Sequence, residues 1–306
     1  MRKIVIVLLC ISLFGAVFSF SSCGKTSNGG YSKTDPKTYL IVGLDDAASN
    51  TDVISLVRVS CGQISVLQIP RDTYVDIGSY PNKINHFVPR SVCNGNSIES
   101  AVSGLASLVS NTFGVKIDGY IAVKSSDVRS FVDSIGGVYV NCDRRRELIA
   151  GDDVVLQLEE GENLLTGDEA IHLIRHRAGY PRADIDRLDM QSLFYGGLLN
   201  TVRGRVSPTK IIGAYLGIRS SVVSSVPYTD VLKMISRRNE FKNAELRVTR
   251  VPGEAVLSEC GLWYYVINKE ETQRTLSNVF SNGSLNFDPE NRFLPKEAAL
   301  SDVYFK

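Results

Sequence analysis

Several arginines lie close to acidic and amide side chains in one polar stretch of the chain, RHRAGYPRADIDRLDMQ. Arg175 and Arg177 are two residues apart, so an extended backbone would point both side chains the same way. Asp184, Arg187 and Gln191 follow with the spacing i, i+3, i+7 and share one face of a helix. Because a guanidinium group matches two phosphate oxygens at once, this pattern predicts a phosphate-binding site. The alternative is a set of surface ion pairs, which contribute little to stability.

Polar residues also follow the predicted strands near the start of the folded part. Asp45 follows one strand, Asp52 precedes the next, Arg71 follows a third, and Lys83 comes shortly afterwards. Since α/β folds place their sites at strand ends, we expect these side chains to gather there. Two separated carboxylates suit Mg²⁺, which binds oxygen ligands and keeps several waters. Although each residue alone is commonplace, together they predict a pyrophosphate site with Mg²⁺.

The familiar catalytic motifs do not occur in the sequence. It contains no Walker A segment, no HExxH and no GxSxG. The 3 histidines are scattered along the chain, which argues against a histidine metal cluster. The chemistry of the site must therefore rest on aspartate and arginine.

The composition is that of an ordinary globular protein. The chain has 306 residues, of which 43% are hydrophobic and 22% charged, and its formal net charge is +1. A nucleic-acid-binding domain normally carries a strong basic excess, so near-neutrality argues against a nucleic-acid partner. Any anion-binding site must therefore be a local group of cations and cannot depend on the charge of the whole chain.

The N-terminus has the pattern of an export signal. Arg2 and Lys3 precede an apolar run at 4–20, and Ser21-Ser22-Cys23 follows. The segment Ser21-Ser22-Cys23 resembles a lipobox, in which the leader is removed by cleavage and Cys23 is lipidated. The alternative is an uncleaved signal anchor. Either one places the protein on the extracytoplasmic face of the bacterial membrane. The sequence divides into a signal peptide or anchor at 1–22, a flexible tether at 23–37, a folded domain at 38–281 and a loosely packed tail at 282–306.

Four cysteines remain in the expected folded domain: Cys61, Cys93, Cys142 and Cys260. Outside the membrane they could form disulfides, and the alternative is that they are buried free thiols. Their spacing contains no CxxC, which argues against a zinc site.

Strand and helix patterns alternate along this domain. We expect strands at 38–43, 53–59, 63–69, 119–123, 138–140 and 246–251, and helices at 98–113, 126–135, 168–174, 186–202, 208–216, 228–236 and 272–280. The alternation predicts an α/β fold with helices on both faces of the sheet. The early hairpin at 53–69 makes the sheet mixed, so the class is a mixed β-sheet between helices, or αβα.

The order of several motifs resembles the LytR-CpsA-Psr family of cell-wall glycopolymer ligases. They are LIVGLDD, TDVISLVRV, ISVLQIPRDTYVDI, KINH, GVKIDGYIAVKSSDVRSFVDSIGGVYVN, LTGDEAIHLIRHR and DIDRLDMQ, in order over residues 38 to 205. The resemblance implies an Mg²⁺-assisted phosphotransferase. It would move a glycopolymer from an undecaprenyl-pyrophosphate carrier to peptidoglycan, with the lipid tail in an apolar cavity of the domain.

The same resemblance assigns roles to individual residues. Asp45 and Asp52 would hold the metal ion. The pyrophosphate-binding set would be Arg71, Lys83, Arg175, Arg177, Arg187 and Gln191. Arg71, Asp184 and Arg187 would be catalytic, with Asp184 acting on the acceptor hydroxyl or orienting Arg187. The sequence departs from the family pattern where Asn50 and Met190 replace usual arginines and Ser192 replaces a usual glutamine. The pyrophosphate site therefore has two fewer cations than is usual in the family.

Two other functions use the same residues. A prenyl-pyrophosphate hydrolase would employ water as the acceptor and would release product at full rate without a glycan. A non-catalytic envelope regulator would bind a polyprenyl phosphate without turning it over, and the missing arginines favour this reading. The paired carboxylates favour catalysis, because burying charge without a partner is costly.

Overall fold

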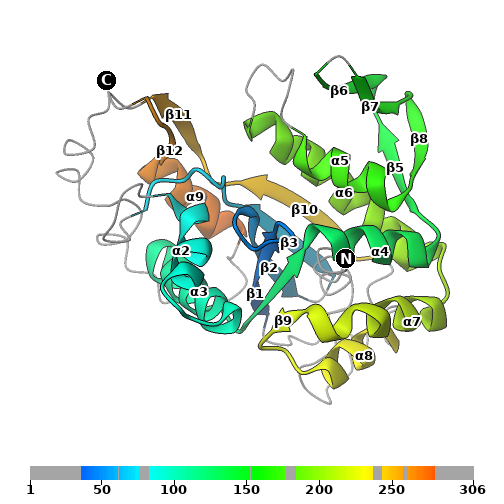
Figure 1. Cartoon of the computed structure of the whole chain (residues 1–306), viewed down its shortest axis with the longest axis horizontal. Helices are drawn as coiled ribbons and strands as arrows, with labels where there is room; N and C mark the ends of the chain where they lie inside the picture. Colours follow the sequence, from blue (N-terminus) through cyan, green and yellow to red (C-terminus); the bar gives the residue numbers. More distant parts are fainter. Residues whose placement is uncertain are drawn as a thin grey trace, which may run out of the picture.

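The structure is a computed structural model that describes residues 36–60, 62–75, 83–151, 153–176, 184–236, 243–257 and 261–279 (Figure 1). The expected leader, Cys23, nearly all of the tether and the tail at 282–306 lie outside these residues. Within the described part, no helix combines the length and apolar character needed to cross a membrane.

A six-stranded mixed sheet forms the centre of the domain, in the order β10-β3-β2-β1-β4-β9. Its strands are β1 (Lys37–Leu44), β2 (Thr51–Ser60), β3 (Gln63–Gln68), β4 (Gly119–Lys124), β9 (Val223–Ser224) and β10 (Glu245–Arg250). β2 is antiparallel to β1 and β3, whereas β4 runs parallel to β1 and β10 runs parallel to β3. The predicted mixed sheet is therefore confirmed.

Both faces of the sheet are covered by helices, because its central strands are apolar on both sides. In β1, Tyr39 and Ile41 enter one buried core, while Leu40 and Val42 enter the other. The first core contains side chains of α4 (Ser125–Ile135), α5 (Gly167–Arg175), α6 (Asp184–Gly204), α7 (Pro208–Ile218) and α8 (Tyr228–Ser236). The second contains side chains of α2 (Phe87–Cys93), α3 (Ile98–Phe113) and α9 (Lys269–Val279). The αβα class is confirmed.

Local sequence signals fix the ends of the helices that bear on the site. At the start of α5, the side chain of Thr166 accepts a bond from the backbone N–H of Glu169, whose carboxylate accepts one in return. α3 ends at Gly114, which has a positive φ of 63°. α6 packs so closely on β5 (Val138–Cys142) that a Cβ at Gly197 would lie 2.5 Å from the carbonyl oxygen of Tyr139.

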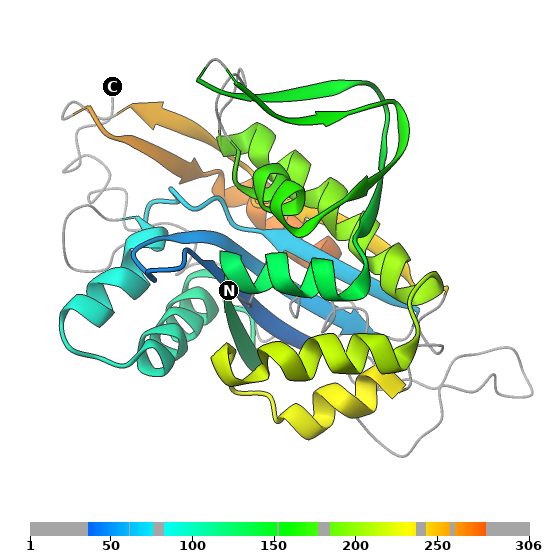
Figure 2. The same ribbon diagram turned by 45° about the vertical axis from the view of Figure 1, so that its right-hand side comes forward.

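Three two-stranded units lie beside the central sheet, and β5 is their only strand that was predicted from the sequence. β5 pairs with β8 (Gly161–Leu165), β6 (Arg146–Ala150) pairs with β7 (Asp153–Leu158), and β11 (Gly253–Leu257) pairs with β12 (Trp263–Ile267). Figure 2 shows the first two units as one long ribbon that folds over α5. Leu148, Leu156 and Leu158 on this ribbon are buried in the first core.

The cysteine pairing is settled for two of the four residues. Cys93 is an exposed free thiol, and Cys142 is a buried free thiol whose pKa is raised by burial. Pairing of all four cysteines is therefore wrong. Cys61 and Cys260 lie outside the described residues.

Candidate functional site

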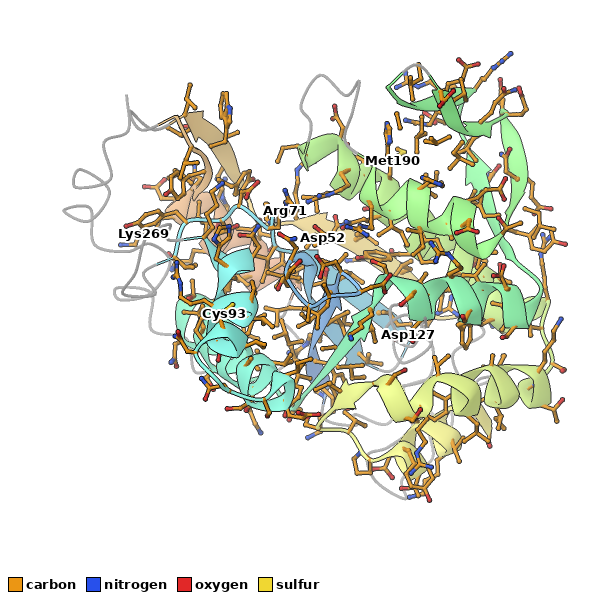
Figure 3. The ribbon with its side chains drawn as sticks, in the orientation of Figure 1. Asp52, Arg71, Cys93, Asp127, Met190 and Lys269 are labelled. Atoms are coloured by element: carbon orange, nitrogen blue, oxygen red, sulfur yellow. The ribbon has the colours of Figure 1, made fainter. Side chains whose placement is uncertain are left out.

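The carboxylate of Asp52 is shared by two arginines from distant parts of the chain. Arg71 Nη1 donates to Asp52 Oδ1 at 2.7 Å, and Arg175 Nη2 lies 3.2 Å from Asp52 Oδ2. Asp52 is the second residue of β2, Arg71 follows β3, and Arg175 ends α5. Figure 3 shows Asp52 beside Arg71, between the part of the molecule with α2, α3 and β11–β12 and the part with α5 and α6.

A second carboxylate, Asp72, joins Lys83 to the same group. Lys83 Nζ lies 3.2 Å from Asp72 Oδ1, and Arg71 Nε lies 3.8 Å from Asp72 Oδ2. These three side chains are mostly buried, with exposed fractions between 12% and 17%. Low local polarity strengthens their mutual attraction relative to a pair in open water. Asp72 is a site residue without a predicted role, although it directly follows Arg71 in the motif IPRD.

Asp45 lies at the same end of the sheet but is held by its own turn. Its oxygens accept bonds from the backbone N–H and hydroxyl of Ser49 (2.7 and 2.6 Å) and from the amide of Asn50 (3.0 Å). Burial raises the pKa of Asp45, but these hydrogen bonds outweigh it and hold the pKa below the usual value. The carboxylate therefore stays ionised well into the acidic range.

Arg187 and Gln191 lie inside the protein, on the face of α6 that meets α5. Both are 1% exposed. Gln191 Nε2 donates to the carbonyl oxygen of Ile174 at 3.2 Å, one residue before Arg175. This bond pairs one of the carbonyls that the end of a helix leaves open. It fixes the end of α5 from which Arg175 reaches Asp52.

Two of the predicted site residues cannot be placed. Arg177 and the side chain of Asp184 lie outside the described residues, so their roles stay predictions. The structure brings Asp52, Arg71, Arg175 and Lys83 into one network, and among the described residues Asp45 makes no direct contact with it.

The departures from the family pattern are accommodated locally. Met190 is 5% exposed and packs in the first core, so an arginine there would have to leave that core to reach an anion. Asn50 bonds to Asp45 as described, and Ser192 donates to Gln68 Oε1 at 3.2 Å. These positions serve packing and hydrogen bonding in this chain.

His86 is a further polar group in this region, without a predicted role in the site. It lies on a short 3₁₀ helix, Ile84–His86, directly after Lys83. Burial lowers the pKa of His86, and the positive charges of Lys83, Arg90 and Arg71 lower it further. The imidazole is therefore neutral at pH 7. Its lowered pKa reflects both burial and the positive charges around it.

The carboxylates meet the requirements of Mg²⁺ in part. Among the described residues, Asp52 Oδ2 is buried without a hydrogen-bond donor, and only the ion pair with Arg175 faces it. Such an oxygen can serve as a metal ligand. Within the described part of the chain there is no cluster of three or more acidic, histidine or cysteine side chains. Because Mg²⁺ is usually bound through one or two carboxylates plus substrate phosphates, Asp45 and Asp52 would be the protein ligands of such an ion.

Taken together, these features define an α/β domain whose strand ends carry a cationic site built on aspartates, a class suited to phosphate-bearing substrates. The chain belongs to the LytR_cpsA_psr family, whose model matches residues 19–281.

Relatives within this family carry the name polyisoprenyl-teichoic acid–peptidoglycan teichoic acid transferase TagU. The protein of that name from Oceanobacillus iheyensis is 27% identical over 264 residues, which cover 83% of this chain and 78% of the relative. The Bacillus subtilis protein is 27% identical over 228 residues, 71% of this chain and 70% of the relative. The crystal structure of B. subtilis TagV matches with a TM-score of 0.64 at 20% identity, over 82% of this chain and 99% of TagV.

Proposed function

We propose that the protein is a transferase that moves a glycopolymer from a polyprenyl-pyrophosphate carrier to peptidoglycan. The observation that carries the proposal is the Asp52 carboxylate shared by Arg71 and Arg175, which fixes two guanidinium groups at one point on the strand ends. Fixed guanidinium groups can bind the oxygens of a pyrophosphate in pairs. The names of the similar teichoic acid transferases agree with this chemistry.

In the proposed reaction, a hydroxyl oxygen of peptidoglycan attacks the phosphorus that bears the glycan. A new P–O bond forms a phosphodiester, the P–O–P bridge breaks, and prenyl monophosphate leaves with the bridging oxygen. The hydroxyl proton passes to Asp184, a role that rests on its place in the sequence motif alone. Phosphoryl transfer requires mainly positioning and stabilisation of charge, so a site without a covalent nucleophile is sufficient.

The cations have separate parts in this proposal. Arg71 and Arg175 face the same carboxylate and would turn their remaining N–H groups to the phosphate oxygens, where negative charge grows in the transition state. Lys83 would act as a point charge on the pyrophosphate. Asp45 and Asp52 would hold Mg²⁺, which supplies further neutralisation of the pyrophosphate when bound.

The setting of the reaction is also part of the proposal. A carrier with a prenyl tail requires a membrane, and the expected leader with Cys23 would keep the domain on its extracytoplasmic face. The tail would lie in an apolar cavity of the domain, and that cavity stays a prediction.

Acceptor dependence provides the direct test. Purified protein is incubated with a prenyl-pyrophosphate-linked glycan and Mg²⁺, with and without peptidoglycan, and released prenyl monophosphate is measured. We expect release and glycan attachment to rise together only when peptidoglycan is present. Full release without peptidoglycan would establish the hydrolase instead, and carrier binding without release in either case would establish the regulator.

A further inference from the structure

The segment that carries Arg71 is held between two other parts of the chain. On one side, the backbone N–H of Ile84 donates to the carbonyl of Thr73 at 2.9 Å. On the other side, Tyr265 of β12 exchanges backbone hydrogen bonds of 2.8 and 2.9 Å with residues 72–74. In the sequence, the hairpin β11–β12 lies near the C-terminal end of the folded domain. Its backbone nevertheless bonds to the residues that directly follow Arg71.

Side chains continue this arrangement around Lys83. Lys83 Nζ lies 5.2 Å from the centre of the Tyr264 ring, within range of a cation–π interaction. The ring of Tyr74 meets the Tyr264 ring edge to face, with centres 5.7 Å apart, and the two tyrosines are 2% and 1% exposed. The Tyr264 ring is therefore fixed by packing, while Asp72 holds the lysine from another direction.

A lysine in this position needs such support. Its ammonium sits on a flexible stem, and ordering that stem costs conformational entropy whenever the charge must be held at one place. Lys83 is 12% exposed, so water does little to solvate its charge. A fixed aromatic face offsets part of that loss and limits the directions in which the ammonium can point.

We propose that Tyr264 is a positioning residue that aims Lys83 at the pyrophosphate of the carrier. This inference rests on the proposed function, in which Lys83 binds that group. The proposal makes the β11–β12 hairpin part of the substrate-binding site. The motifs that resemble the family end earlier in the chain, within residues 38 to 205. Tyr264 acts only through Lys83 and touches no reacting atom.

A change of the ring that preserves its shape tests the proposal. Tyr264→Phe keeps the aromatic face, whereas 3,4,5-trifluorophenylalanine at the same position keeps the shape but withdraws negative charge from it. We expect geranylgeranyl diphosphate to bind the trifluoro protein about tenfold more weakly than Tyr264→Phe. KM for the carrier should rise by a similar factor, while kcat changes less, because binding is affected more than the chemical step.

The same pair of substitutions in a Lys83→Met background tests whether Tyr264 affects probe binding through Lys83. If Tyr264 acts through Lys83, the two ring variants should bind the probe equally once the ammonium is gone. The same two ring substitutions at Tyr228 are the matched control, because the guanidinium of Arg219 lies 3.8 Å from the centre of that ring, outside the site. They should leave the affinity for the probe unchanged.

The outcomes separate this inference from the function on which it rests. Equal affinity of the two ring variants in the presence of Lys83 would overturn the role of Tyr264, and so would a difference that persists after Lys83→Met. If Lys83→Met itself leaves probe binding unchanged, the pyrophosphate site of the proposed function is wrong as well.

Discussion

Arg71 Nη1 lies 2.7 Å from Asp52 Oδ1, and this ion pair joins the first residues of β2 to the loop that follows β3. Asp52 also faces Arg175, so its single negative charge is shared by two positive ones. The local balance is therefore positive even though the net charge of the whole chain is only +1. An anion that enters this region meets oriented guanidinium groups and needs little rearrangement of the protein.

Arg71→Lys should lower kcat/KM for glycan transfer about 100-fold, because one ammonium cannot replace a planar fork that faces two carboxylates. Arg71→Ala should abolish transfer while circular dichroism reports an intact fold. Arg250→Lys is the matched control, since Arg250 pairs with Asp189 at 3.2 Å outside the network. Full activity of the Arg71→Ala protein would remove this residue from the proposed chemistry.

Asp52→Asn tests the proposed metal ligand and the arginine pairing together. Loss of the carboxylate leaves Arg71 and Arg175 without a common partner, so we expect transfer to fall about 100-fold. EDTA should reduce the activity of the wild-type protein, and added Mg²⁺ should restore it. The residual activity of Asp52→Asn should respond less to EDTA. An undiminished response would show that the ion is held by other groups.

The main elements could be predicted from the sequence because their signals are local. The helix at 98–113 was predicted with the bounds found for α3, since its apolar spacing ends at Gly114. The buried strand at 38–43 and the hairpin at 53–69 follow from their apolar runs, and they correspond to β1 and to β2 with β3. The β6–β7 and β11–β12 hairpins were missed. Their strands expose many side chains, and Ile149, Leu257 and Trp263 are 43–56% exposed, so strand and polar loop look alike in the sequence.

The contacts of the site were less predictable than its composition. Asp52 was expected to hold a metal ion, and the structure pairs it with two arginines. Asp72 joins Lys83 to Arg71, and its position next to Arg71 in the sequence does not predict that it pairs with Lys83. Such pairings depend on where the turns at the strand ends place each side chain. Periodicity fixes a face of a strand or helix but does not fix a partner across the fold.

Gln191→Leu should lower the free energy of unfolding by about 1–2 kcal/mol, because the carbonyl of Ile174 loses its donor inside the protein. The end of α5 should then be less well fixed, so Arg175 is held less firmly at Asp52 and KM for the carrier should rise. Urea denaturation and steady-state kinetics measure the two effects. Gln157→Leu, at an exposed position of β7, should change stability by less than about 0.5 kcal/mol. Equal effects of the two substitutions would contradict this reading.

The pH dependence of stability should reveal the positive surroundings of His86. Burial first, and then the charges of Lys83, Arg90 and Arg71, lower the pKa of His86 below its ordinary value of 6.5. The unfolded chain therefore binds a proton at a higher pH than the folded protein does. The contribution of neutral His86 to the free energy of unfolding is fully present above pH 6.5 and is lost as pH falls through the pKa of the folded protein. The free energy of unfolding should therefore decrease with acidification. His86→Asn should weaken this decrease, as measured by urea denaturation at pH 7.5, 6.5 and 5.5. An identical pH profile for wild-type and His86→Asn proteins would mean that neither burial nor the three cations lower the pKa of His86 in the folded protein.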